Sequence, residues 1–224
     1  MRKIFFPILF GIAGCAVLIA LGTWQVQRLA WKEGILANID ARLAQAPTAI
    51  DLTMTEDADE YRRVTVSGTP TGEELHVLVS GTAAGTGYRG VSKFVTDAGD
   101  AILIDQGLLA LDNKDAPALT QPTDVTGTIL WPDDKNSSTP DPDLTKNIWF
   151  ARNVPDMAAH LDTAPIMVVV TQATPPDPRI TPLPITSANI KNDHLEYAIT
   201  WFLLAIVWAI MSLYLIFRTR QEDA

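Results

Sequence analysis

One histidine, His194, stands where a polar segment of the chain enters a long apolar run. Residues 189–193 read Asn-Ile-Lys-Asn-Asp, and the apolar run that follows continues to Phe217. In a helix, such a run is long enough to cross a bilayer core, which takes about 20 residues. A ligand held by His194 would therefore lie at a membrane surface.

A helix beginning here would place aromatic side chains near His194. Tyr197 and Trp201 follow it at i+3 and i+7 and share its face, while Ala198 at i+4 leaves space beside the imidazole. Such a surface could accept a flat aromatic ligand, and neutral imidazole is a usual axial ligand of haem iron. The alternative interpretation is a polar anchor at the membrane surface, a common role for a single interfacial histidine.

Little else in the sequence could do chemistry. The three histidines, His76, His160 and His194, form no helical pair with zinc-ligand spacing, and the Gly-x-Ser-x-Gly motif of hydrolases does not occur. His76 alternates with apolar neighbours and is interpreted as a surface or rim side chain of a strand. His160 is interpreted as a structural residue at the end of a short helix, where a cation is favourable. We therefore expect a protein that is not an enzyme.

The composition excludes several classes of function. The only cysteine, Cys15, falls within an apolar segment, so the chain has no internal disulfide, no Cys-x-x-x-Cys copper site and no c-type haem attachment motif. Asp and Glu number 26 against 17 Lys and Arg. This acidic balance argues against nucleic acid as a partner, because nucleic acid calls for clustered basic residues. The acidic residues are expected mostly in solvated loops.

Two apolar segments, residues 4–24 and 195–217, are predicted to span the lipid bilayer as helices. Basic residues beside such spans are retained on the cytoplasmic side. Here they lie just before the first span and just after the second, at Arg2, Lys3, Arg218 and Arg220. Both termini are thus predicted to be cytoplasmic in a bacterial inner membrane, with residues 25–193 forming one periplasmic domain.

The first span has an alternative interpretation as a cleaved signal. Its basic start and the Ile-Ala-Gly-Cys sequence at residues 12–15 resemble a lipoprotein signal peptide. However, residues 16–21 remain apolar or small, where a processed lipoprotein usually becomes polar. We therefore expect this segment to be kept as an uncleaved span.

The first helix is expected to continue beyond the membrane as far as Pro47. Trp24, Arg28 and Trp31 recur at i, i+4 and i+7 and so share one helix face. Two tryptophans with an arginine between them are typical of an interfacial aromatic belt. Binding of a ligand by this face is the alternative interpretation.

Beyond Pro47 the sequence indicates a mainly antiparallel β domain with short helices, which could close as a small barrel. Short alternating apolar runs are separated by Gly, Pro and Asp, as is typical of strands and turns. Strands are expected at residues 61–68, 74–80, 88–96, 101–105, 124–131 and 166–173. Turns are expected at residues 82–87 and 97–100, the second as a hairpin.

Two loops and one short helix interrupt these expected strands. Residues 132–146 and 174–184 are rich in proline and short polar residues and are interpreted as exposed connectors. Residues 153–161 are expected to form a helix with Pro155 in its first turn. Trp149, which stands in an Ile-Trp-Phe sequence, is expected in the core.

Several motifs follow one another along nearly the whole chain. The most specific are Gly-Thr-Trp-Gln-Val-Gln-Arg-Leu-Ala-Trp-Lys at residues 22–32 and Asn-Asp-His-Leu-Glu-Tyr-Ala-Ile-Thr-Trp-Phe at residues 192–202. Between them lie Tyr-Arg-Arg-Val at 61–64, Gly-Tyr at 87–88 and Asn-Ile-Trp-Phe-Ala-Arg at 147–152. Together these motifs resemble the Surfeit locus 1 protein family.

The resemblance implies an assembly factor for haem–copper terminal oxidases, especially cytochrome c oxidase. It implies that the protein binds haem a and delivers it to oxidase subunit I or stabilises it there, with haem a synthase as a further candidate partner. The family points to His194 as the ligand of the haem iron, and the cofactor-binding candidates beside it are Tyr197, Trp201, Trp24 and Arg28. The alternative function is a scaffold that stabilises an oxidase assembly intermediate without touching haem.

One strand end departs from the family pattern. Where the family usually has Asn-Arg-Gly-Trp, this chain reads Asp105-Gln106-Gly107-Leu108. The missing arginine and tryptophan put any ligand or partner contact at this strand end in doubt. The glycine, interpreted as a turn residue, is kept, so the fold is expected to be unchanged.

Overall fold

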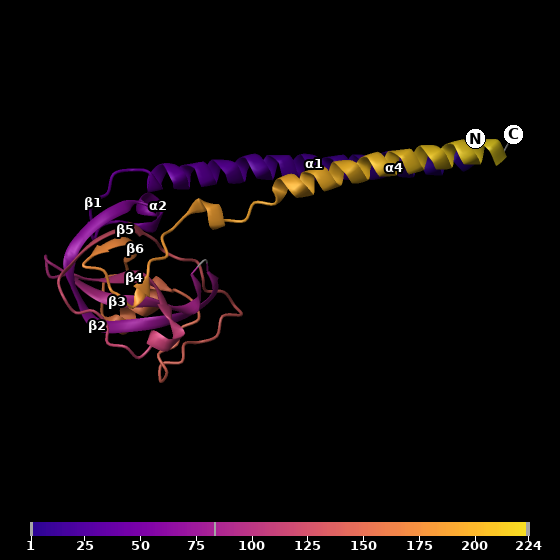
Figure 1. The fold of residues 1–224 in the computed structure, drawn as a ribbon. Helices are drawn as coiled ribbons and strands as arrows, with labels where there is room; N and C mark the ends of the chain where they lie inside the picture. The colour runs from indigo at the N-terminus through magenta and orange to yellow at the C-terminus, as the bar shows by residue number, and fades with distance from the viewer. Residues whose placement is uncertain (1, 83, 223–224) are drawn as a thin grey trace. The chain divides into compact units, whose positions relative to one another are not determined.

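The computed structural model describes residues 2–82 and 84–222 and divides into two compact units. One unit combines the residues up to Asn38 with those from Ser187 onward, and the other contains Ile39–Thr186. The elements of both are labelled in Figure 1.

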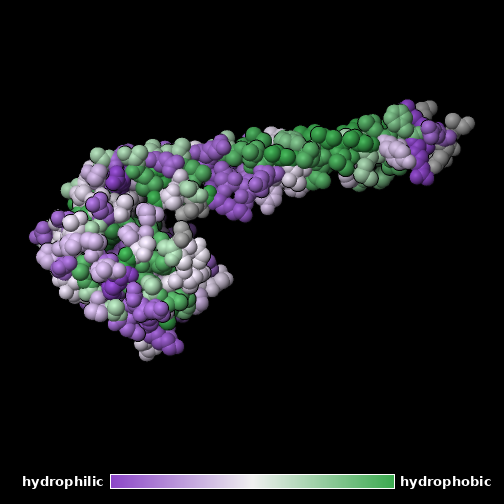
Figure 2. Space-filling view, in the orientation of Figure 1, coloured by the Kyte–Doolittle hydropathy of each residue, from purple (hydrophilic) through white to green (hydrophobic). Residues whose placement is uncertain are grey.

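The helical unit contains the two long helices α1 (Arg2–Leu43) and α4 (His194–Glu222), preceded on the α4 side by the 3₁₀ turn η2 (Ser187–Asn189). The two helices lie side by side and run antiparallel (Figure 1). Both are long and apolar enough to cross a membrane, and Figure 2 shows a continuous hydrophobic surface along the middle of the pair. The predicted membrane protein with two spanning helices is confirmed, as is the continuation of the first helix beyond its apolar segment.

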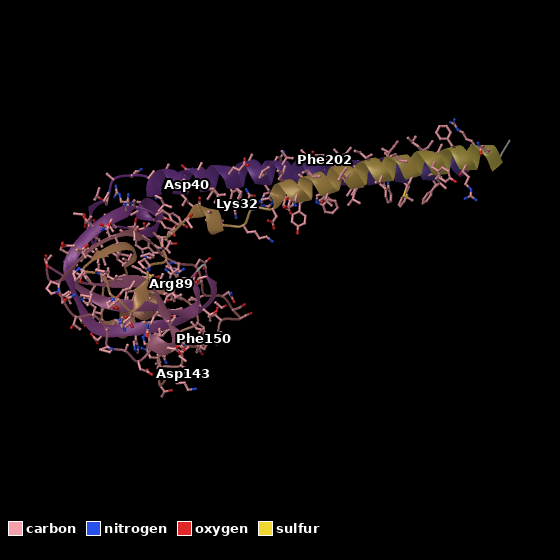
Figure 3. All side chains as sticks on the ribbon, viewed as in Figure 1. Lys32, Asp40, Arg89, Asp143, Phe150 and Phe202 are labelled. Carbon is pink, nitrogen blue, oxygen red and sulfur yellow. The ribbon has the colours of Figure 1, made fainter. Side chains whose placement is uncertain are left out.

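Small residues of α1 set how closely the two helices pack. Gly22 lies against the ring of Phe202 (labelled in Figure 3), and a Cβ added there would come within 2.7 Å of the ring. The Gly11 carbonyl oxygen accepts a hydrogen bond of 3.2 Å from the Trp208 indole nitrogen. Because these contacts fix the register of the pair, they also fix which polar residues of α1 and α4 meet at its boundary.

The second unit is a barrel closed by one long strand. β2 (Arg63–Thr82) pairs through its first half with β5 (Thr123–Ile129) and through its second half with β3 (Gly85–Thr96). β3 pairs with β4 (Ala101–Ala110), β4 pairs with β6 (Met167–Thr174), and β6 returns to β5. Only the β4–β6 contact within this circuit is parallel, so the predicted mainly antiparallel β domain is confirmed.

Short elements complete the unit. Two-residue strands flank the barrel, β1 (Thr48–Ala49) parallel to β2 and β7 (Ile180–Thr181) antiparallel to β4. The remaining short elements are α2 (Glu56–Asp59), the 3₁₀ turn η1 (Leu111–Asn113) and α3 (Val154–Leu161). The hairpin expected at residues 97–100 is confirmed, because it joins the antiparallel strands β3 and β4.

The structure differs from the strands and the turn expected at residues 61–87. Residues 61–68 and 74–80 were expected as separate strands but belong to the single strand β2, whose pairing with β3 continues past an irregularity between Pro70 and Glu74. The turn expected at residues 82–87 is shorter, because Gly85 already begins β3 and pairs with Thr82; residue 83 lies outside the described residues.

Apolar side chains form one core inside the barrel and a second core under α3. The inner core includes Val64, Phe94, Ile102 and Val168. The second core contains Trp149, which is 5% exposed, as its sequence setting predicted. The helix expected at residues 153–161 is also confirmed: the Asn153 side chain caps α3 by accepting a 2.9 Å hydrogen bond from the backbone N–H of Asp156.

The unit buries a cluster of charged side chains that comes from a strand and from a segment expected to be an exposed connector. His76, interpreted from the sequence as a surface or rim residue, is only 8% exposed, so that interpretation is wrong. Its Nε2 atom lies 3.0 Å from a Glu74 carboxylate oxygen, and Arg179 reaches the other oxygen at 3.1 Å. Arg179 also binds Asp177, which is buried, so residues 174–184 are not simply an exposed connector. These side chains can be buried because each charge finds a partner.

The glycine of the departing segment, Gly107, does not form a turn. It lies inside β4 with φ of +121°, and a Cβ there would overlap the Thr181 carbonyl oxygen of β7. The register with β3 slips at this point, so that Gln106 is an extra residue in β4. Its buried amide donates a 2.6 Å hydrogen bond to Ser92. The expected turn is therefore a bulge, and β4 continues to Ala110 instead of ending at Asp105.

The buried carboxylate of Glu74 should make the unit sensitive to acid. Burial raises the pKa of Glu74, but hydrogen bonds from His76 and Arg179 and the charge of Arg179 outweigh it, so the pKa lies below its ordinary value of 4.5. Its contribution to stability is therefore complete above pH 4.5 and is lost as the pH falls through the lower pKa of the folded state. We expect the difference in melting temperature between wild type and Glu74→Gln to shrink over that acidic range.

The control for this melting series is Glu73→Gln, which changes the neighbouring, exposed carboxylate. Its melting temperature should follow wild type at every pH. A difference for Glu74→Gln that stays constant from neutral pH to below pH 4 would contradict the proposed role of the ionised carboxylate.

Candidate functional site

His194 is the first residue of α4, and it is held by a residue of α1. Its Nδ1 atom lies 2.7 Å from Oε1 of the Gln25 side chain. Gln25 is 9% exposed, whereas His194 is partly exposed, so the hydrogen bond joins a buried amide to an imidazole at the polar end of an apolar helix. Both residues belong to the helical unit.

This hydrogen bond determines which imidazole nitrogen can bind a ligand. An amide oxygen only accepts hydrogen bonds, so the imidazole must carry its proton on Nδ1. In the neutral ring the lone pair is then on Nε2, the atom that can ligate a metal. Within the described part of the chain, Nε2 of His194 has no hydrogen-bond partner.

The residues expected to share the face of His194 have different surroundings. Tyr197 is exposed, Trp201 is partly exposed, and Ala198 is 2% exposed. The space expected beside the imidazole at Ala198 is therefore filled by protein. A planar ligand would have to contact the exposed side of α4, where Tyr197 lies.

The candidates on α1 form a cationic and aromatic surface. The Arg28 guanidinium lies over the Trp31 ring, 4.1 Å from its centroid, and both Trp24 and Trp31 are exposed. Arg28 follows Gln25 by three residues, so the two share a helix face. This arrangement suits the interfacial belt, and it also leaves a cation available close to the turn of α1 that holds His194.

The pairing of Gln25 with His194 was not predicted from the sequence. The two residues are 169 positions apart in the sequence. No local pattern predicts such a pair, because it depends on the register in which α1 and α4 pack.

The donor set of this site fits haem iron better than a free metal ion. Among the described residues, no group of three or more His, Cys, Asp or Glu could hold a metal ion. Haem needs only axial ligands from the protein, since the macrocycle supplies the other iron ligands. A single imidazole with a free Nε2 atom at an apolar surface meets that need.

Comparison with known proteins places these features within one family. A model of the SURF1 family matches residues 12–206, a range that includes Gln25 and His194. A SURF1-like protein of Rickettsia conorii is 31% identical over 216 residues, covering 91% of this chain and 88% of the relative. A SURF1-like protein of Monosiga brevicollis is 26% identical, with 89% of this chain and 83% of the relative covered.

A vertebrate relative extends the comparison. Surfeit locus protein 1 of Gallus gallus is 26% identical over 206 residues, which cover 81% of this chain and 66% of the relative. The family match covers α1 from residue 12 onward, the whole barrel, and the first part of α4 as far as residue 206. The chain therefore belongs to the SURF1 family.

Proposed function

We propose that this protein is an assembly factor for a haem–copper terminal oxidase, which binds haem a and passes it to oxidase subunit I. The proposal combines the function that the family resemblance implies with one observation, the His194–Gln25 hydrogen bond that leaves Nε2 free. Haem a synthase is the partner expected to supply the haem, and the protein itself acts as a carrier rather than an enzyme.

His194 and the residues around it have different roles in the proposed binding of haem. His194 would ligate the iron through Nε2, and the apolar surface of α4 with Tyr197 and Trp201 would hold the macrocycle. Trp24 offers a further aromatic contact, and Arg28 is the cation available to a propionate. Haem would supply the iron centre, and the protein would supply the ligand, the apolar surface and the charge.

A strain that lacks this protein tests the carrier function against a pure scaffold. Membranes of that strain should have low oxidase activity and little haem a in subunit I, and the wild-type gene should restore both. A carrier requires that the His194→Ala variant, present at normal membrane level, restores neither. Full restoration by the variant would support the scaffold instead.

The proposed location is a bacterial inner membrane with both termini in the cytoplasm and the β unit in the periplasm. Basic residues outside both spans motivate this orientation. We expect alkaline phosphatase fused after Ala224 to be inactive and the same enzyme inserted between Asp133 and Asn136 to be active. Activity only in the C-terminal fusion would contradict the orientation.

Arg28→Ala should weaken haem retention by roughly ten- to a hundredfold. A charge-assisted hydrogen bond to a propionate contributes about 1.5 to 3 kcal/mol, and the variant loses it. The measurement is a haem titration of the purified protein, with Lys32→Ala, a neighbouring cation on α1 (Figure 3), as the control. Equal affinities for wild type and Arg28→Ala would assign Arg28 to the aromatic belt alone.

A further inference from the structure

We infer that Gln25 is a positioning residue for His194: its side-chain oxygen fixes the imidazole tautomer and orientation, and thereby sets how strongly Nε2 donates to iron. The inference rests on the proposed haem-carrier function, but its first part concerns the protein without haem. The juxtaposition that carries it is the 2.7 Å contact between Gln25 Oε1 and His194 Nδ1.

Gln25 is a buried polar residue, and its burial requires a hydrogen-bond partner. A primary amide removed from water costs free energy unless its polar atoms find hydrogen-bond partners. Gln25 is nonetheless buried on an α1 face that packs against α4, while Gln27, two residues later, is exposed. The partner that accounts for burying the Gln25 oxygen is the His194 N–H group.

The chemistry of the pair also supports this role. Histidines that bind metals usually donate their other N–H group to a carbonyl or carboxylate oxygen, which fixes the ring and raises the basicity of the ligating nitrogen. Gln25 offers a carbonyl oxygen without adding a charge. The ligand strength of His194 should therefore be intermediate between that of an imidazole without a partner and that of one paired with a carboxylate.

The packing around the pair supports it as well. Gly22 precedes Gln25 by one turn and lets the Phe202 ring of α4 approach the α1 backbone. On the α4 side Ala198, one turn after His194, is buried. Small residues on both helices thus hold the two backbones close together, so the Gln25 side chain has a defined partner instead of a range of solvated positions.

The first test uses the protein without haem, labelled with ¹⁵N-histidine and reconstituted in lipid nanodiscs. With only three histidines in the chain, the His194 signals are identified by their loss in His194→Ala. Nitrogen shifts at neutral or mildly alkaline pH should show the proton of wild-type His194 on Nδ1. In Gln25→Leu, which keeps the volume but removes the acceptor, the proton should redistribute between the two nitrogens.

The second test uses the same variants with haem a bound. Gln25→Leu should weaken haem binding by roughly ten- to a hundredfold, the usual effect of losing such a hydrogen bond, and should lower the iron–histidine stretching frequency of the ferrous protein. Gln25→Glu should change that frequency in the opposite direction and lower the reduction potential, because a carboxylate partner makes the imidazole a stronger donor. Gln27→Leu, the same change at an exposed site, should match wild type in every measurement.

The outcomes separate this inference from the proposed function. If Gln25→Leu keeps the Nδ1 proton, or loses it without any change in affinity, frequency or potential, Gln25 does not position the ligand, although haem binding stands. Identical effects of Gln27→Leu and Gln25→Leu would overturn the inference as well. If wild-type protein binds no haem, the proposed function fails first, and the ligand-positioning role fails with it.

Discussion

The Asp105→Ala variant is expected to lose about 3 to 5 kcal/mol of stability in the β unit, the usual cost of removing one partner from a buried ion pair. Asp105 is 0% exposed, and one of its oxygens receives hydrogen bonds from Arg89 at 2.7 Å and Arg152 at 3.2 Å. Without the carboxylate, two largely buried guanidinium groups would face each other. Figure 3 labels Arg89 within this unit.

The electrostatics of Arg152 support this expectation. Burial lowers the pKa of Arg152, but the charge of Asp105 and the hydrogen bond to Asp134 raise it above its ordinary value. The guanidinium therefore stays charged, and its deprotonation cannot reduce the cost of removing Asp105.

Thermal and denaturant unfolding of the full chain in detergent measure the effect. Asp105→Asn keeps the shape and one acceptor, so its loss of stability should be smaller than that of Asp105→Ala. The control is Asp143→Ala (Asp143 is labelled in Figure 3). This carboxylate pairs with Lys146 at the surface and accepts hydrogen bonds from the Thr145 hydroxyl and the Lys146 N–H, so its removal should cost much less stability than Asp105→Ala. If the Asp105→Ala and Asp143→Ala variants had equal free energies of unfolding, the buried ion pair would stabilise the protein no more than the surface pair does.

The elements that carry a local signal were predicted well. Uninterrupted apolar runs gave both long helices, and the run of turn residues at 97–100 gave the hairpin between β3 and β4. Asn153 and Pro155 mark the start of α3 by capping and by fixed backbone geometry, which act within one helical turn. These features depend on residues close together in the sequence.

The features that were missed depend on distant residues. His76 was interpreted as a surface or rim residue, because the network that buries it with Glu74 is completed by Arg179, 105 residues after Glu74. Residues 105–108, the segment that departs from the family pattern, also depend on distant residues. Asp105 is buried because Arg89 and Arg152 meet there, and Gly107 is needed because β7 passes close to its backbone.

The candidate haem site also combines residues with a local sequence signal and a residue that depends on distant contacts. The aromatic and basic candidates of each helix could be identified because helical periodicity brings them to one face. His194 could be identified because a histidine is unusual at the start of an apolar run. Gln25 could not be assigned to His194, because their contact requires the register set by Gly22 against Phe202.

His194→Ala is expected to remove iron ligation while leaving the protein in the membrane with its β content unchanged. The residue is the first of α4 and only partly buried, so its truncation empties little core. Tyr197→Phe should have a milder effect, because the exposed ring is kept and only a hydroxyl group is lost.

The control for this change is His160→Ala. His160 is exposed on α3 in the β unit, where its ring contacts the edge of Trp149, and it lies outside the proposed haem site. The variant removes an imidazole from the same chain and should bind haem a as wild type does.

The visible spectrum of the purified protein titrated with haem a shows directly whether His194 ligates the iron. We expect a histidine-ligated haem spectrum for wild type and His160→Ala, and a shifted or absent spectrum for His194→Ala. An unchanged spectrum in His194→Ala would show that His194 is not the required ligand.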